Sequence, residues 1–249
     1  MNGRSAGGDS SIVRTKKGGY MRISRAMAMI TIAVLIAGVG CTKQVTGTAE
    51  PDPNKPPLSV SKDGYGIVAG FDNAPAKIEI YTEPQCNHCA DLQADFGDQL
   101  AYYIAVGQLE VTYRPMTFLD DKTGGYSGQV SNALFLATEK AGKPEVTATG
   151  TEFQRFVEGV WAHQRPGGDP PTGDELKEMA KKAGIPDAVA ENIKGGGSAV
   201  NTKAMDDANF EYLYEIDNVE MGTPTVYDLK KGEKLDIYDN DWLNKLIQS

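Results

Sequence analysis

The sequence predicts an α/β fold in which a strand–helix–strand unit precedes a helical insertion and a β-hairpin. Residues 76–84, AKIEIYTEP, alternate apolar and polar side chains as a strand does, and from Cys86 apolar residues recur at three- and four-residue steps, as in a helix. Residues 109–118, LEVTYRPMTF, are rich in the β-branched and aromatic residues typical of strands. A strand, a helix and a strand in this order form a βαβ unit, whose two strands pair in parallel.

The section after this unit, residues 125–217, is expected to be a helical insertion. Its segments have amphipathic patterns separated by glycine and proline. Thr149 or Thr151 is expected to cap the second of its helices. The aromatic-rich stretch NFEYLYEI (209–216) has helical spacing, which favours a place in the core over a groove for client proteins. The expected helical segments are residues 131–142, 151–164, 173–184, 185–197 and 201–216.

The remaining elements complete a domain that we place at residues 65–249. GIVAG (66–70) is a short candidate strand ahead of the βαβ unit. TPTVYD (223–228) and LDIYD (235–239) flank the turn LKKGEK and predict a β-hairpin, and residues 239–248 are expected to form a final helix.

The N-terminus has the pattern of a signal peptide, which we place at residues 1–40, with Met21 as an alternative start. Basic residues precede an uncharged run at 26–40, which is shorter than the roughly 20 apolar residues of a bilayer-spanning helix. GVGC at its end resembles a bacterial lipobox, in which the cysteine is acylated, although Gly38 replaces the usual leucine-like residue. We therefore expect Cys41 to carry a lipid tether; an uncleaved membrane anchor is the alternative. Both interpretations place the domain outside the cytoplasm.

Residues 41–64 are expected to be a flexible linker between the lipid and the domain, because they are rich in proline, threonine and small polar residues. With no separate N-terminal dimerisation domain in this stretch, a monomer is favoured.

The charge of the mature chain excludes some partners. The whole chain has 25 basic and 34 acidic side chains, and the first 40 residues hold six of the basic ones and one acid, Asp9. The rest is therefore strongly acidic, which argues against nucleic acid and against binding anionic lipid by charge.

The motif CNHC provides the chemistry. Cys86 and Cys89 lie three residues apart on the first turn of a helix, where two thiols can form a disulfide. The ring so formed is small and adds little folding stability, which makes a structural role less suitable. A helix N-terminus lowers the pKa of a thiol. We therefore expect Cys86 to be the attacking thiolate and Cys89 the resolving thiol.

The two residues between the cysteines are expected to tune the pair. His88 can stabilise the Cys86 thiolate by a hydrogen bond or positive charge; an incidental exposed histidine is the alternative. Asn87 offers only local hydrogen bonding. A zinc site needs about four ligands, and joining the cysteines with His88 and the remote His163 requires an improbable fold-back, so we expect no metal and no other cofactor.

These features resemble the DsbA-like thiol–disulfide oxidoreductases of the thioredoxin superfamily. The matching residues are the strand KIEIY, the motif CNHC, the helical section and GTPTVYD. The resemblance implies a thioredoxin-like fold in which Thr223-Pro224 has a cis bond, faces the cysteines and binds substrate backbone. The chain departs from the family at Asn87, where proline is common, and at Ile80, where many relatives have a buried acid. Glu83 is a possible proton carrier in its place; a solvated loop carboxylate is the alternative.

The sequence thus predicts an extracytoplasmic enzyme that oxidises cysteine pairs of exported proteins through a Cys86–Cys89 disulfide. The resemblance implies that a membrane quinone-linked partner reoxidises it. Two alternatives stay open: a disulfide reductase or isomerase with the same residues, because residue identity does not fix the direction of electron flow, and a peptide-binding lipoprotein without redox activity.

Overall fold

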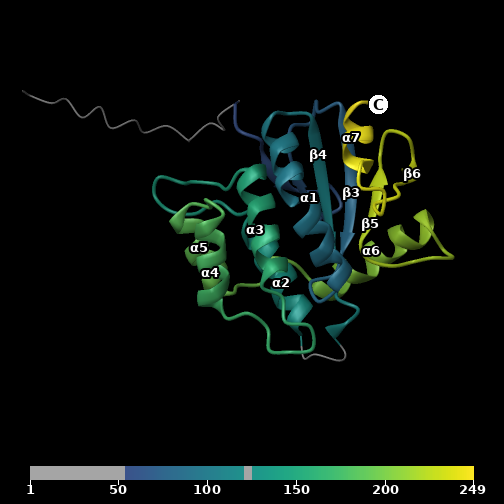
Figure 1. Cartoon of the computed structure of the whole chain (residues 1–249). Coiled ribbons are helices and arrows are strands. Elements are labelled where there is room, and N and C mark those ends of the chain that lie inside the picture. The colour runs from purple at the N-terminus through teal and green to yellow at the C-terminus, as the bar shows by residue number, and fades with distance from the viewer. Residues whose placement is uncertain (1–53, 121–124) are drawn as a thin grey trace, which may run out of the picture. The chain divides into compact units, whose positions relative to one another are not determined.

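A six-stranded mixed sheet organises residues 54–120 and 125–249, the part of the chain that the computed structural model describes (Figure 1). The strand order is β1-β2-β4-β3-β5-β6. β3 and β4 pair in parallel, with Ile80 opposite Tyr113, and the other neighbours are antiparallel. The strands are β1 (Leu58–Val60), β2 (Ile67–Ala69), β3 (Ala76–Thr82), β4 (Leu109–Pro115), β5 (Thr225–Asp228) and β6 (Glu233–Lys234).

The predicted βαβ unit is confirmed, because helix α1 (Asn87–Ala105) connects the parallel strands β3 and β4. The helical insertion also lies where it was predicted, between β4 and β5. Its helices are α2 (Tyr126–Leu136), α3 (Gly150–Ala162), α4 (Gly173–Lys182), α5 (Asp187–Gly195) and α6 (Thr202–Ile216), and a short helix α7 (Trp242–Ile247) ends the chain. Of the two predicted caps for α3, Thr149 forms a capping box with Glu152.

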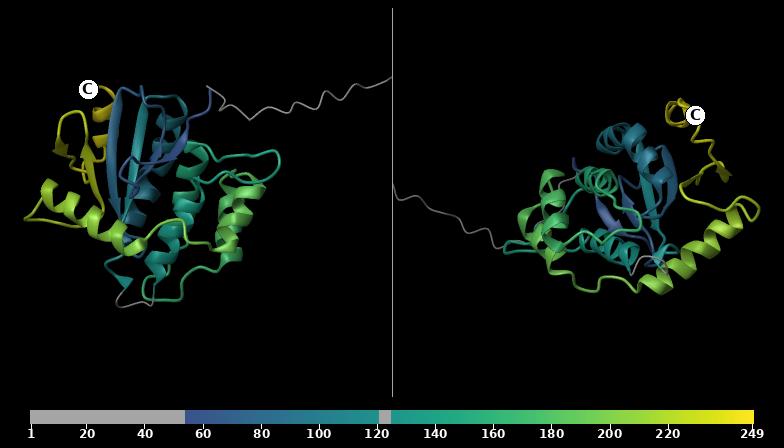
Figure 2. Two further views of the ribbon diagram at one scale, coloured as in Figure 1. Left: turned by 180° about the vertical axis from the view of Figure 1, so that it is seen from behind. Right: turned by 60° about the horizontal axis from the view of Figure 1, so that its bottom comes forward.

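The two faces of the sheet are covered differently. Ile78 and Ile80 of β3 belong to the main core with residues of α1 and α3, helices that run side by side in Figures 1 and 2. Tyr81, which follows Ile80 and points to the other face, packs with Leu213 of α6 in a second cluster. The alternation of β3 therefore separates two apolar layers, and both Ile80 and Tyr81 are fully buried.

Part of the predicted linker belongs to the fold, so the expected boundary at residue 65 is wrong. β1 pairs with β2 along three residues, and the carbonyls of Pro56 and Pro57 accept hydrogen bonds from Gly150 and Gly70 at 2.8 and 3.0 Å. The segment shows no apolar period because an edge strand with exposed residues needs none. The signal peptide, the lipidation residue Cys41 and the linker up to residue 53 lie outside the described residues.

Two further expectations differ from the structure. The second strand of the hairpin is β6, which ends before the predicted strand at residues 235–239 begins. The Leu235 N–H still donates to the Val226 carbonyl, but beyond this bond the segment does not pair with β5, and Leu235 and Ile237 pack against the main core. The aromatic stretch of α6 is only partly in the core, since Phe210 and Tyr214 are 44% and 51% exposed. Helix α6 lies on one face of the sheet, so two of its three aromatic residues face solvent and the third, Tyr212, is half-buried.

Candidate active site

The two cysteines lie at the start of α1, in different environments. Cys86 is the N-cap residue and is partly exposed, whereas Cys89, in the first turn, is 1% exposed and belongs to the main core. The Cys86 carbonyl accepts hydrogen bonds from the N–H groups of Cys89 and Ala90 at 3.1 and 3.2 Å. No S–S bond joins the two sulfur atoms in the structure. The helix start thus presents one sulfur to the surface and buries the other.

This placement separates the acidities of the two thiols. The pKa of Cys86 is lowered from 9.0 to about 5, first by a hydrogen bond from Cys89, against burial, and further by Thr223 and by the backbone N–H groups of Cys89 and His88. The pKa of Cys89 is raised well above its ordinary value, mainly by burial and then by its contact with the Cys86 thiolate. At neutral pH, Cys86 is therefore a thiolate and Cys89 a thiol.

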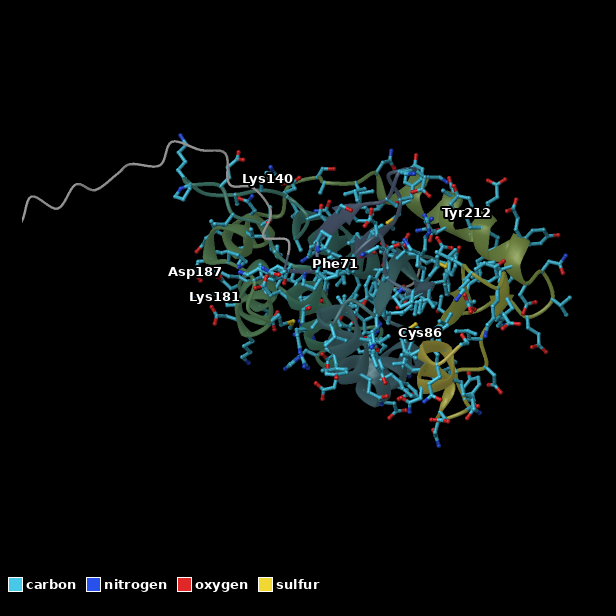
Figure 3. The ribbon with its side chains drawn as sticks, turned by 90° about the horizontal axis from the view of Figure 1, so that it is seen from above. Phe71, Cys86, Lys140, Lys181, Asp187 and Tyr212 are labelled. Carbon is cyan, nitrogen blue, oxygen red and sulfur yellow. The ribbon has the colours of Figure 1, made fainter. Side chains whose placement is uncertain are left out.

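Thr223 and Pro224 lie against Cys86, although more than 130 residues separate them along the chain. The Cys86 sulfur lies 3.1 Å from the Thr223 carbonyl oxygen, and the Thr223-Pro224 peptide bond is cis. The position of Cys86 is labelled in Figure 3. The loop before β5 is thus brought next to the helix start.

Two hollows adjoin this loop. One, of about 260 Å³, lies between α1 and the chain after β6, and Leu92, Phe96, Pro224 and Tyr238 are among its lining residues. The second, of about 490 Å³, also contains Pro224 and Tyr238 and extends over the start of β5. Thr223, whose carbonyl oxygen contacts the Cys86 sulfur, lines the second hollow, and His88 lines the first.

The residues between the cysteines point to solvent. The side chain of His88 is 69% exposed, and its Nδ1 lies 3.5 Å from a carboxylate oxygen of Asp91. Asn87 is exposed at the first position of α1. The imidazole thus faces Asp91, and the tuning of Cys86 by these two side chains stays a prediction.

Glu83 is buried, so the alternative of a solvated loop carboxylate is wrong. It has no exposed surface, and its backbone N–H lies 3.5 Å from the Cys89 sulfur. Burial raises the pKa of Glu83 to about 7, while hydrogen bonds from Ser127 and from the Gln85 N–H act in the opposite direction and the charges of Asp120 and Cys86 add to the rise. The residue whose backbone contacts the buried thiol thus carries a carboxyl group that can take up or release a proton near neutral pH.

Three polar residues around Glu83 were not predicted from the sequence. Ser127, at the start of α2, donates its hydroxyl to Glu83 and accepts from the Gln85 amide at 3.0 Å. Asp120 accepts from the Ser127 N–H at 2.6 Å and from the Gly128 N–H at 2.7 Å, which fixes the start of α2 against the site. A tertiary contact between β3 and a helix 44 residues later has no local signature in the sequence.

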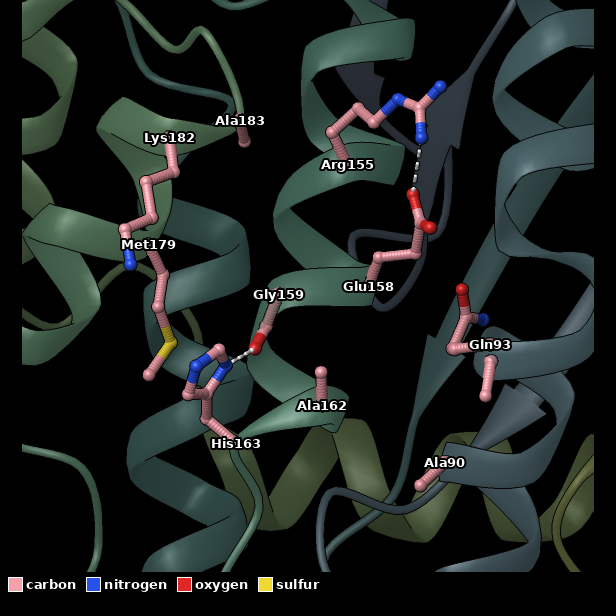
Figure 4. A pocket seen from close by; sticks show the side chains of 11 residues that line it. Ala90, Gln93, Arg155, Glu158, Gly159, Ala162, His163, Met179, Lys182 and Ala183 are labelled. Atoms are coloured by element: carbon pink, nitrogen blue, oxygen red, sulfur yellow. Dashed lines mark hydrogen bonds and ion pairs between the residues drawn. The ribbon is translucent and has the colours of Figure 1, made fainter.

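The second histidine lies elsewhere. His163, at the end of α3, bonds through Nδ1 to the Gly159 carbonyl at 2.7 Å (Figure 4). It lines a hollow of about 330 Å³ between α1, α3 and α4 whose lining includes neither cysteine. Among the described residues there is no group of three or more histidine, cysteine or acidic side chains arranged to hold a metal ion. None of the helices in these residues is long and apolar enough to cross a bilayer.

Comparison with known proteins identifies the family. Residues 62–247 match the family model described as Thioredoxin, which is most of the chain. The chain belongs to the thioredoxin family.

Several solved structures have a similar fold. MdbA, a thiol-disulfide oxidoreductase from Corynebacterium matruchotii, superposes with a TM-score of 0.62 at 20% identity, over 78% of this chain and 92% of MdbA. Reduced DsbA from Mycobacterium tuberculosis gives 0.56 at 20% identity, over 74% and 91%. Oxidised BdbD from Bacillus subtilis gives 0.54 at 17% identity, over 78% and 97%. These similarities confirm the thioredoxin-like fold of the DsbA type.

A curated relative at the sequence level is the serine/threonine-protein kinase PknE of Mycobacterium tuberculosis, 26% identical over 187 residues. The match includes 73% of this chain but 31% of the kinase. The chain thus spans about a third of that relative, and the name of the whole protein says nothing of the chemistry of the shared part.

Proposed function

We propose that this thioredoxin-family protein is an extracytoplasmic thiol–disulfide oxidoreductase that oxidises cysteine pairs of exported proteins. The observation that carries the proposal is the contrast between the two thiols: Cys86 is accessible with a pKa of about 5, and Cys89 is buried with a raised pKa. An attacking thiolate beside a protonated resolving thiol is the arrangement that disulfide exchange requires.

The cycle begins with the Cys86–Cys89 disulfide. A client thiolate attacks the Cys86 sulfur, a client–Cys86 bond forms, the Cys86–Cys89 bond breaks, and its electron pair goes to Cys89. Cys89 then takes a proton from the carboxyl group of Glu83, a buried residue whose backbone N–H lies 3.5 Å from the Cys89 sulfur. A second client thiolate then attacks the client sulfur of the mixed disulfide and releases Cys86 as a thiolate. The client loses two electrons and the protein gains them.

Thr223 and Pro224 are proposed to bind the client backbone. Their loop meets the Cys86 sulfur at the Thr223 carbonyl and forms a wall of both neighbouring hollows through Pro224. A client strand placed there can add hydrogen bonds to the backbone of the loop while its side chains occupy the hollows. Its cysteine would then lie next to Cys86.

The direction of electron flow is proposed to be oxidative. A thiolate stabilised in the reduced form makes the corresponding disulfide a stronger oxidant, and the pKa of Cys86 is lowered to about 5. A lipid on Cys41 would hold the domain at the outer face of the cytoplasmic membrane, where a quinone-linked membrane partner would reoxidise it. Equilibration with glutathione tests the direction: we expect a potential well above about −270 mV, the thioredoxin value, whereas a value near it would indicate a reductase.

Trapping of clients tests the exchange reaction itself. In cells, Cys89→Ala should accumulate mixed disulfides between Cys86 and client proteins, and these should disappear on reduction. Cys86→Ser in the same background is the matched control and should trap none. Equal recovery of proteins with both variants would instead indicate a peptide-binding protein whose cysteines are incidental.

A further inference from the structure

We infer that Ser127 is a positioning residue for the proton step at Cys89, as the last member of a directed chain of hydrogen-bond donors that ends on Glu83. The inference rests on the proposed function, because it concerns the residue that serves Cys89 with a proton. It assigns a chemical task to the first turn of the helical insertion, which the thioredoxin core alone does not contain.

The chain of donors has a single direction. The backbone N–H of Gly167 donates to Gln85 Oε1 at 3.1 Å, and Gln85 Nε2 donates to the Ser127 hydroxyl oxygen at 3.0 Å. The Ser127 hydroxyl in turn donates to Glu83 Oε1. Because an amide hydrogen already points at the Ser127 oxygen, the one hydroxyl hydrogen is directed at the carboxylate. Each link thus orients the next toward Glu83.

The residues of this hydrogen-bond chain are buried, so each hydrogen bond to Glu83 has a large effect on the ionisation of its carboxyl group. Glu83 and Ser127 have no exposed surface, and Gln85 is 3% exposed. A buried carboxylate without donors would stay protonated far above neutral pH, whereas hydrogen bonds to its charged form favour ionisation. The Gln85 N–H, 2.6 Å from Glu83 Oε2, is fixed by the local backbone, so Ser127 is the donor that the insertion adds.

The other titratable groups around Glu83 do not supply this effect. The charge of Cys86 acts on it from the start of α1, where Cys89 contacts the Glu83 backbone N–H, and the charge of Asp120 acts on it from the segment after β4. A Cys86 thiolate and an Asp120 carboxylate both disfavour a charge on Glu83. Without the Ser127 donor, the carboxyl would be less able to accept the Cys89 proton at neutral pH.

The experiment isolates the step in which Cys89 reacts. At acid pH, where Cys89 stays protonated, the Cys86 thiolate of the reduced full-length protein carrying Cys41→Ser first attacks the symmetrical disulfide of thionitrobenzoate. The S–S bond of the reagent breaks, the Cys86–thionitrobenzoate disulfide forms, and the released thionitrobenzoate is removed with the excess reagent. After a jump to higher pH, the Cys89 proton moves to the Glu83 carboxylate and the Cys89 sulfur attacks Cys86. The Cys86–Cys89 bond forms, and thionitrobenzoate leaves with the electron pair of its broken bond, so its absorbance reports the rate.

In the unsubstituted site the rate should rise with a midpoint at or slightly below pH 7, because the pKa of Glu83 is about 7 beside a charged Cys86 and the mixed disulfide removes that charge. Ser127→Ala should move this midpoint upward by about one to two pH units, the size expected for one hydrogen bond to a charged group. Gln85→Met, which removes the amide that directs the hydroxyl, should move it in the same direction by less. A midpoint unchanged in both variants would overturn the inference.

The same helix supplies a matched control. Ser131, one turn after Ser127 on α2, is also fully buried, and its hydroxyl has no hydrogen-bond partner within the described residues. Ser131→Ala should leave the midpoint in place. If Ser131→Ala shifts the midpoint as much as Ser127→Ala does, the shift would come from a general loosening of α2 and not from the lost hydrogen bond to Glu83. Glu83→Gln separates the two proposals: if it removes the midpoint near pH 7 while Ser127→Ala does not move it, the role of Glu83 stands and that of Ser127 fails. If the mixed disulfide never resolves without these substitutions, the proposed function fails.

Discussion

Replacing Cys89 by alanine removes the hydrogen bond that lowers the Cys86 pKa most. Thr223 and the backbone N–H of His88 remain, so part of the shift should survive. A hydrogen bond to a charged group contributes about 1.5–3 kcal/mol, and about 1.4 kcal/mol corresponds to one pKa unit. The pKa of Cys86 in Cys89→Ala is therefore expected to rise from about 5 to roughly 6–7, which leaves about half or more of it ionised at pH 7.

The rate of alkylation by iodoacetamide as a function of pH measures this pKa. A Cys41→Ser background leaves Cys86 as the sole thiol of the Cys89→Ala variant, because the chain has three cysteines. Cys89→Ser retains a hydroxyl donor and should keep the midpoint near 5. The reasoning is refuted if the midpoint of Cys89→Ala stays near 5, or if serine and alanine raise it equally.

Three other predictions concern stability. Arg114 is buried against Glu79 and Asp63, so Arg114→Met should cost about 3–5 kcal/mol in chemical denaturation, whereas Arg155→Met, which breaks exposed pairs, should cost at most about 1 kcal/mol; equal costs would contradict this view. Thr149→Ala removes the cap of α3 and should lower the free energy of unfolding by about 1 kcal/mol. Thr151→Ala should lower it by less, because the Thr151 hydroxyl has no hydrogen-bond partner in the described residues. Folding lowers the pKa of Cys86 from 9.0 to about 5, so the thiolate stabilises the reduced protein above pH 9, and this stabilisation is lost as the pH falls through 5. The difference in unfolding free energy between the unsubstituted protein and Cys86→Ser should therefore grow from pH 5 to pH 9. A difference that does not change with pH would argue against the thiolate.

Local patterns predicted the framework of the domain. Strand β3 and helix α1 have clear periods of two and of three to four residues, and their order with β4 requires parallel pairing. Edge strands β1 and β6 escaped prediction because three and two exposed or half-exposed residues have no period to read. Position at a sheet edge is decided by the partner strand.

The candidate site was predictable where its residues are neighbours in sequence. Cys86 and Cys89 follow from spacing at a helix start, whereas the burial of Glu83 depends on α2, which covers it from a distant part of the chain. Ser127 could not be found from the sequence, because a serine at a helix start is common and usually caps its own helix. Here the Ser127 hydroxyl instead donates to Glu83, the residue that follows β3.

The central claim is that the Cys86–Cys89 disulfide can be passed to a client. The most direct measurement mixes the oxidised protein with a reduced peptide that contains two cysteines and follows the thiols of both molecules. The account predicts that each protein molecule oxidises one peptide and becomes a dithiol, and that Cys86→Ser transfers nothing. A peptide that keeps its thiols while the protein keeps its disulfide would contradict it.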